Sequence, residues 1–233
     1  MATSSKGTQG APAVAALTNL ARIEGGAEGK PAQEALGRVL AGREQAIVKL
    51  SLNGNPVCNG LVVDGRRGWV AAPRYCLHEG EGAASRASIE FSDGSKTPVA
   101  RMAESQNGLL AFLNVGKQGL PDLSLSSVQP HIGGTIIQIG FDIAMDRLRV
   151  VLGRVIEVGP MTFRGAGGQT RTDAPGLRVA LSADERSMAG TGGAPLFDNE
   201  GNVACMTFQS DRNRNEECLA AEAIAIAMKQ LPP

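Results

Sequence analysis

The feature that most constrains this chain is a succession of short apolar runs that begins near residue 46 and continues almost to the end. Turn-forming pairs such as Asn53-Gly54, Asp64-Gly65 and Asp93-Gly94 separate these runs. Many short strands at close spacing are typical of a sandwich or a barrel, so we predict an all-β fold. The predicted strands are 46–52, 57–63, 68–72, 87–91, 97–102, 109–115, 135–139, 148–158, 177–182, 195–197, 202–208 and 218–226.

The order of these runs predicts three parts along the chain. Residues 1–43 form an N-terminal extension with a short helix at 31–41, where Pro31 precedes good helix formers. Residues 44–118 and 119–233 each hold half of the strands, and the loop-like stretch 116–130 joins them. We expect a short helix at 225–231, and we expect the N-terminal segment to pack on its own barrel rather than on a partner.

Composition limits the class of protein more than it limits the function. Hydrophobic residues make up 42% of the 233 residues, which allows a packed core. Lys+Arg and Asp+Glu are both 23, so bulk charge favours neither a nucleic acid nor an anionic membrane as partner. No apolar run of about 18 residues is present, so we predict no membrane span. We also expect no cofactor. The polar N-terminus has no signal-peptide pattern, so if the protein matures in an oxidising compartment its signal peptide has been removed.

Several segments in the second half carry a resemblance to a known family. The run 182–196, SADERSMAGTGGAPL, resembles the nucleophile segment of trypsin-like proteases of the bacterial HtrA type. The stretches 195–208, 221–231, 133–141 and 153–159 are similar to the family's following and preceding strands, in the same order. The family positions matched in the first run are Asp184, Gly190, Gly193, Pro195 and Leu196.

The first half is similar to the chymotrypsin-type pattern, in the segment CNGLVV…GWVAAPRYC from Cys58 to Cys76. The resemblance implies a chymotrypsin-like fold with two six-stranded antiparallel β-barrels, and it implies a Cys58–Cys76 disulfide. Cys205 and Cys218 lie on predicted neighbouring strands and are either bridged or free buried thiols. Disulfides form in oxidising places, so the expected location is the periplasm or the cell exterior.

The catalytic triad that the resemblance would supply is missing from the matching positions. Tyr75 stands where the family has its histidine, Leu109 where it has its aspartate, and Gly192 where it has its serine. A phenol is a poor base at neutral pH, and the other two carry no reactive group. We therefore expect a pseudoprotease that is not an enzyme and binds a protein or peptide partner. Gly190, Thr191 and Gly192 match the oxyanion loop.

Three alternatives stay open at this point. If Ala194 is an insertion, Thr191 takes the nucleophile position and His78 is its base. A metal-binding or structural accessory role would use His78 and His131, although they fall in different barrels and no metal site is expected. Arg186 lies where the family's specificity pocket is lined, although we expect it in solvent.

Overall fold

The computed structural model describes residues 42–77, 86–143, 146–165, 171–181, 192–211 and 215–232. The expected helix at 31–41 lies outside these residues, as do His78, Arg186, Gly190 and Thr191. Within the described part, no helix has the length and the apolar character needed to cross a membrane.

The first half of the chain forms one antiparallel sheet of seven strands in the order β5-β4-β1-β2-β3-β7-β6. Apolar side chains of the central strands build its core, and Trp69, Leu61 and Phe112 are almost completely buried. The 3-10 helix η2 (Arg74–Leu77) follows β3 directly and ends at the core. The other elements are η1 (Arg43–Ala46), β1 (Ile47–Leu52), β2 (Asn55–Asp64), β3 (Trp69–Pro73), β4 (Ala87–Glu90), β5 (Lys96–Pro98), β6 (Arg101–Glu104) and β7 (Leu110–Asn114).

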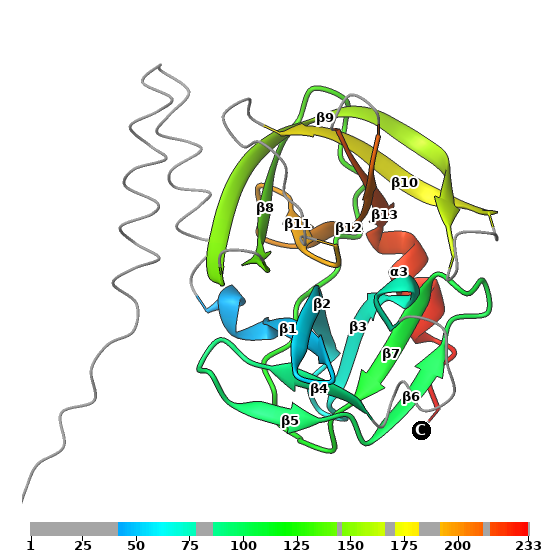
Figure 1. Cartoon of the computed structure of the whole chain (residues 1–233). Helices are drawn as coiled ribbons and strands as arrows, with labels where there is room; N and C mark the ends of the chain where they lie inside the picture. The colour runs from blue at the N-terminus through cyan, green and yellow to red at the C-terminus, as the bar shows by residue number, and fades with distance from the viewer. Residues whose placement is uncertain are drawn as a thin grey trace, which may run out of the picture.

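The second half forms a closed barrel of six strands in the order β10-β13-β12-β11-β8-β9, which is the ring of ribbons in the upper part of Figure 1. The chain ends in a short helix that packs against this barrel, next to β12 and β13. The elements are β8 (Thr135–Asp142), β9 (Arg147–Arg164), β10 (Arg171–Leu181), β11 (Pro195–Phe197), β12 (Val203–Ser210), β13 (Glu216–Ala220) and α3 (Ala221–Met228).

The all-β prediction is confirmed, and the pair of antiparallel sheets is consistent with the chymotrypsin-like double barrel. The first sheet has seven strands rather than six because the predicted strand 97–102 is split. Val99 N donates to Ala87 O on one side and Ala100 N donates to Asn114 O on the other, so the chain crosses between two strands there. The predicted strand 218–226 is also wrong in its second half, because β13 ends at Ala220 and α3 begins at Ala221.

Polar contacts hold the two sheets together where β1 and β2 face β8. Asn59 on β2 is fully buried, and its amide makes two hydrogen bonds to the backbone of Phe141 on β8. Lys49 on β1 forms ion pairs with Glu90 of its own sheet, at 2.6 Å, and with Asp146 of the second half, at 2.7 Å. These contacts fix the junction between the sheets, which is where the candidate site lies.

Candidate functional site between the two sheets

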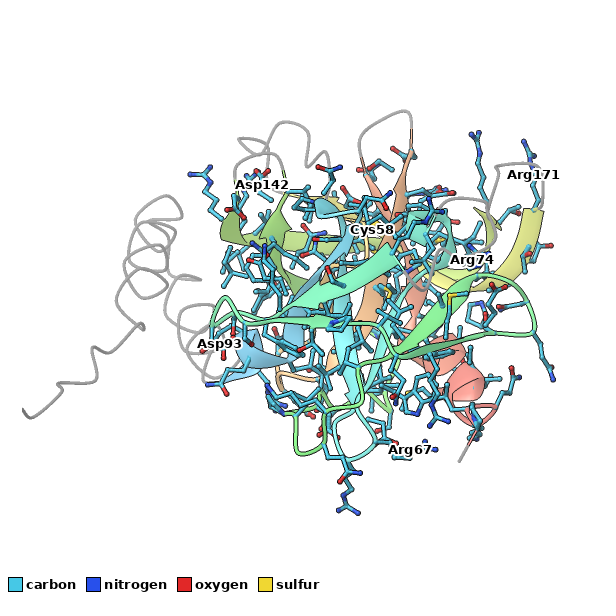
Figure 2. All side chains as sticks on the ribbon, turned by 60° about the horizontal axis from the view of Figure 1, so that its bottom comes forward. Cys58, Arg67, Arg74, Asp93, Asp142 and Arg171 are labelled. Atoms are coloured by element: carbon cyan, nitrogen blue, oxygen red, sulfur yellow. A yellow bond between two sulfur atoms is a disulfide. The ribbon has the colours of Figure 1, made fainter. Side chains whose placement is uncertain are left out.

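A disulfide positions the first-sheet side of the site. Cys58 on β2 is bonded to Cys76 in η2, with their Cα atoms 6.0 Å apart. The bridge ties η2 to the centre of the sheet and so holds the preceding residue, Tyr75, at the junction. Figure 2 labels Cys58 on β2 and Arg74, the first residue of η2.

Tyr75 is packed by aromatic rings of the second barrel. Its ring lies edge-on to Phe208 on β12 at 5.3 Å between centroids, and Phe208 meets Phe163 on β9 at 5.1 Å. Burial raises the pKa of the Tyr75 hydroxyl well above its usual range, and the charge of Glu216 raises it further. Tyr75 therefore stays protonated at neutral pH and can donate a hydrogen bond, but it is not a base.

The turn that begins at Gly192 forms the second-barrel side of the site. Asn59 N donates to Gly192 O at 2.7 Å, and Gly193 N donates to Thr207 O at 2.8 Å. A Cβ atom placed on Gly192 would lie 2.3 Å from the Tyr75 hydroxyl oxygen. The structure thus brings Tyr75 and Gly192, two of the three predicted triad positions, into direct contact.

The third predicted position, Leu109, is hydrogen-bonded to the backbone of Arg74, the residue before Tyr75. It is fully buried, and its carbonyl accepts from the backbone N of Arg74 at 2.7 Å. Its side chain offers no acceptor for a base. The carboxylate of Glu104 on β6 is bound by the Arg74 guanidinium at 2.6 Å.

Of the other predicted site residues, the structure describes only some. Gly190 and Thr191 of the expected oxyanion loop lie outside the described residues. Gly193, next in the chain after Gly192, has its N–H occupied by Thr207. His131 is exposed in the turn before β8, and the described residues hold no group of three or more metal-binding side chains.

Of the two alternatives left open for Cys205 and Cys218, the structure has the free buried thiols. They lie on paired strands but are offset, since Cys205 is opposite Ala220 and Cys218 is opposite Thr207. The Cys205 side chain lies within hydrogen-bonding reach of the Cys218 thiol, but no bond joins the two sulfur atoms. Burial raises the pKa of the Cys218 thiol well above its ordinary value, so it is unreactive.

Sequence reasoning did not identify the buried carboxyl group of Glu216. It is 4% exposed at the start of β13 and accepts a hydrogen bond from Ser210 Oγ at 3.3 Å. Burial raises the pKa of Glu216 to about 7, and the Asp211 carboxylate raises it further against the effect of the Ser210 hydrogen bond. Alternation along the strand was the available signal, because Glu216 shares a face with buried Cys218 and Ala220.

The comparisons with known proteins agree with this architecture. The family model for the trypsin-like peptidase domain matches residues 58–206. The chain therefore belongs to the trypsin-like peptidase domain family. No significant match was found among the curated proteins.

Among the solved structures, Rv3671c from M. tuberculosis H37Rv is similar to this chain at 15% sequence identity. The inactive form of that protease matches with a TM-score of 0.67, over 84% of this chain and 93% of that chain. Its active form matches with a TM-score of 0.69, over 82% of this chain and 83% of that chain. At this identity the likeness shows the fold alone.

These findings correct the expectation that the chain is not an enzyme. The family to which the chain belongs is one of peptidases. The expectation rested on Tyr75, Leu109 and Gly192, and it gave these three positions more weight than the alternative nucleophile Thr191. Chemistry in a site is supplied by geometry and not by fixed sequence positions, so that inference was too strong.

The contact between Tyr75 and Gly192 gives a first prediction. We expect Gly192→Ala to lower the free energy of unfolding by about 2 kcal/mol, because the new methyl group would overlap the Tyr75 hydroxyl. In a Tyr75→Phe background the cost should fall below about 1 kcal/mol, since the next neighbours lie at 3.4 and 3.5 Å. Urea unfolding of the four proteins measures this.

Gly193→Ala is the matched control for that cycle. Its Cβ would lie 2.0 Å from Asn59 O, a backbone atom, and its φ is +82°. The Tyr75→Phe change should give no relief there. Equal coupling of Tyr75 to both glycines would show that the hydroxyl is not the obstacle.

The buried Glu216 predicts a pH-dependent stability. A carboxyl whose pKa is raised in the folded state stabilises that state below its unfolded pKa of 4.5, and this contribution is lost as pH rises through about 7. We expect Glu216→Gln to remove about 2 kcal/mol of the fall in unfolding free energy between roughly pH 5 and 8. Urea unfolding across this range checks the prediction, and parallel curves for the parent and the variant would contradict it.

Proposed function

We propose that this chain binds an extended segment of polypeptide along β12, beside Tyr75 and Gly192. One observation carries the proposal: among the described strands, the end of β12 has a strand partner on one side only. Backbone pairing of β12 toward β11 ends at Thr207, which bonds Gly193 and Ala194. Beyond it, the residues up to Ser210 have β13 as their only strand partner among the described strands. An exposed strand edge binds an extended peptide by adding it as a further strand.

The surroundings of this edge fit a polypeptide ligand. Phe208 and Tyr75 supply an apolar wall, and both come from elements held by the disulfide and the barrel. Membership in a peptidase family supports the same class of ligand, because peptidases act on polypeptide chains. We place the protein in the periplasm or the cell exterior, since the Cys58–Cys76 bridge needs an oxidising compartment.

Binding of fluorescein-labelled unfolded casein, followed by anisotropy, tests this proposal. A Ser210→Cys variant carrying a bulky maleimide places an obstruction at the edge, because Ser210 is exposed at the end of β12. Ser127→Cys with the same label is the control, on the exposed loop between the sheets. We expect casein affinity to fall at least about tenfold for the first protein only. Equal affinities, or no binding by the parent protein, would reject the proposal.

Hydrolysis of the bound segment is a second proposal, and family membership favours it. Tyr75 is not a base, and Leu109 and Gly192 carry no reactive group, so the nucleophile must come from elsewhere. Thr191 directly precedes Gly192 in the chain, and His78 is the candidate base; both lie outside the described residues.

Release of fragments from unfolded casein tests that second proposal. We expect turnover by the parent protein that is lost in Thr191→Ala and kept in Thr97→Ala, a control on the distant strand β5. Turnover that survives in Thr191→Ala would remove Thr191 as the nucleophile. No turnover by the parent would remove the hydrolysis proposal and leave the binding proposal standing.

A further inference from the structure

The second barrel has a gap in its strand pairing at one end. β9 pairs with β8 as far as Arg154 and then continues to Arg164 with β10 as its strand partner. β12 bonds toward β11 as far as Thr207 and then continues to Ser210 with β13 as its strand partner. Because β11 and β8 lie between β12 and β9 in the barrel, the ends of β12 and β9 border the same gap, each with one edge unpaired among the described strands.

One glutamine side chain bridges this gap. Gln209 on β12 donates from Nε2 to Thr162 O on β9 at 3.3 Å, and its Oε1 accepts from Arg164 N at 3.4 Å. Beside these contacts, the rings of Phe163 and Phe208 meet at 5.1 Å between centroids. Neighbouring strands lie about 4.8 Å apart, so a strand added between two others needs about twice that distance. An extended glutamine side chain with its hydrogen bond spans a distance of that order.

The two bonds from Gln209 to β9 have the pattern of a parallel strand. Thr162 O and Arg164 N flank Phe163, and in a parallel ladder one residue of the added strand donates to such a carbonyl and accepts from such an amide. β9 runs opposite to β12, because β9 pairs antiparallel with β10, β10 with β13, and β13 with β12. A segment that is antiparallel to β12 is therefore parallel to β9, and one of its residues can make both bonds that the carboxamide now makes.

The surroundings limit the pairing to this stretch of β9. Pro160 has no backbone N–H, which is typical of an edge strand and prevents regular pairing further back along β9. Gln209 Nε2 also donates to Glu217, whose other carboxylate oxygen accepts from Arg178 Nη2 at 2.8 Å. Because of this second acceptor, the Gln209 carboxamide keeps a partner when another group takes its place on β9.

We propose that a polypeptide bound along β12 also pairs with β9 at Thr162 and Arg164, so that it lies between the two edges and completes the barrel at this end. In the free protein the Gln209 carboxamide occupies these two backbone groups, and the ligand backbone replaces it there. The ligand residue beside Phe163 must carry a backbone N–H, which excludes proline at that position. This second edge rests on the polypeptide binding proposed above and defines its other contact surface.

Exchange of the Arg164 amide distinguishes pairing with one edge from pairing with two. Hydrogen–deuterium exchange followed by NMR is measured on the whole chain, free and saturated with unfolded casein. We expect casein to slow exchange of the Arg164 amide about tenfold, together with the amides at the end of β12. Casein that protects β12 and leaves Arg164 unchanged would overturn pairing with β9 and leave the proposed function intact. Protection of neither strand, with no change in casein anisotropy, would overturn the proposed function and the pairing with β9 together.

A Gln209→Ala variant tests the place that the glutamine holds. The Arg164 amide loses its Gln209 acceptor, so its exchange in the free protein should become about fivefold faster, and casein affinity should rise about threefold because no side chain has to be replaced. Gln230→Ala is the matched control, since Gln230 is another exposed glutamine whose Oε1 accepts from a backbone N–H, that of Gln106, at 3.2 Å. The control should change neither quantity. Weaker casein binding by Gln209→Ala, or equal effects of the two variants, would overturn the placement of the ligand on β9.

Discussion

Asn59→Leu is expected to lower the free energy of unfolding by about 4 kcal/mol. Asn59 Nδ2 donates to Phe141 O at 3.0 Å, and Phe141 N donates to Asn59 Oδ1 at 2.6 Å. The change leaves both backbone groups buried without partners, at about 1–3 kcal/mol each. Leucine is of similar size, so a cavity adds little. Urea unfolding monitored by Trp69 fluorescence measures the effect, because Trp69 is the one tryptophan of the chain.

Asn55→Leu is the control for that prediction. Asn55 is exposed at the start of β2, on the same strand as Asn59, and a surface substitution there should change stability by about 0.5 kcal/mol or less. If Asn59→Leu costs no more than this control, the amide is not what joins the two sheets.

Removal of the disulfide in a Cys58→Ala/Cys76→Ala protein should cost about 3 kcal/mol. The bridge joins residues with a sequence separation of 18. A disulfide that closes a loop of this size stabilises the folded protein mainly by restricting the unfolded chain. The same change frees η2, so we also expect weaker casein binding, because Tyr75 precedes Cys76 in η2.

A reductant provides the control for the disulfide prediction. Dithiothreitol should lower the unfolding midpoint of the parent protein to that of the double variant and should leave the variant unchanged. Cys205 and Cys218 are already free thiols, so they contribute nothing to this difference. A parent protein with the same midpoint in both conditions would contradict a stabilising bridge.

Local sequence pattern was enough to predict most strands of this protein. It failed where pairing with distant segments determines where a strand breaks or ends. The run 97–102 is continuous in sequence, yet β5 pairs with β4 and β6 pairs with β7. Only the pairing partners reveal the break between them. At the C-terminal end, the alternation of β13 gives way to a helix at Ala221, although the apolar composition hardly changes.

The residues of the candidate site were likewise predicted only in part from the sequence. Tyr75 and Gly192 were found by their places in the family pattern, and the structure puts them in contact. Alternation along β13 places Glu216 on a buried face, but its electrostatic effect on Tyr75 depends on tertiary packing, which no local motif records. Asn59 was missed because its partner Phe141 is 82 residues away in the chain. The non-enzyme expectation is contradicted by the family match, because it gave three sequence positions more weight than the alternative Thr191.

Hydrogen–deuterium exchange with and without unfolded casein tests polypeptide binding along β12 most directly. The account predicts slower exchange of backbone amides at the end of β12, between Thr207 and Ser210, when casein is present, because the ligand pairs with that edge. The rim strand β5 of the first sheet should exchange at an unchanged rate. Protection that appears on β5 and not on β12, or no protection despite saturating casein, would contradict binding at this site.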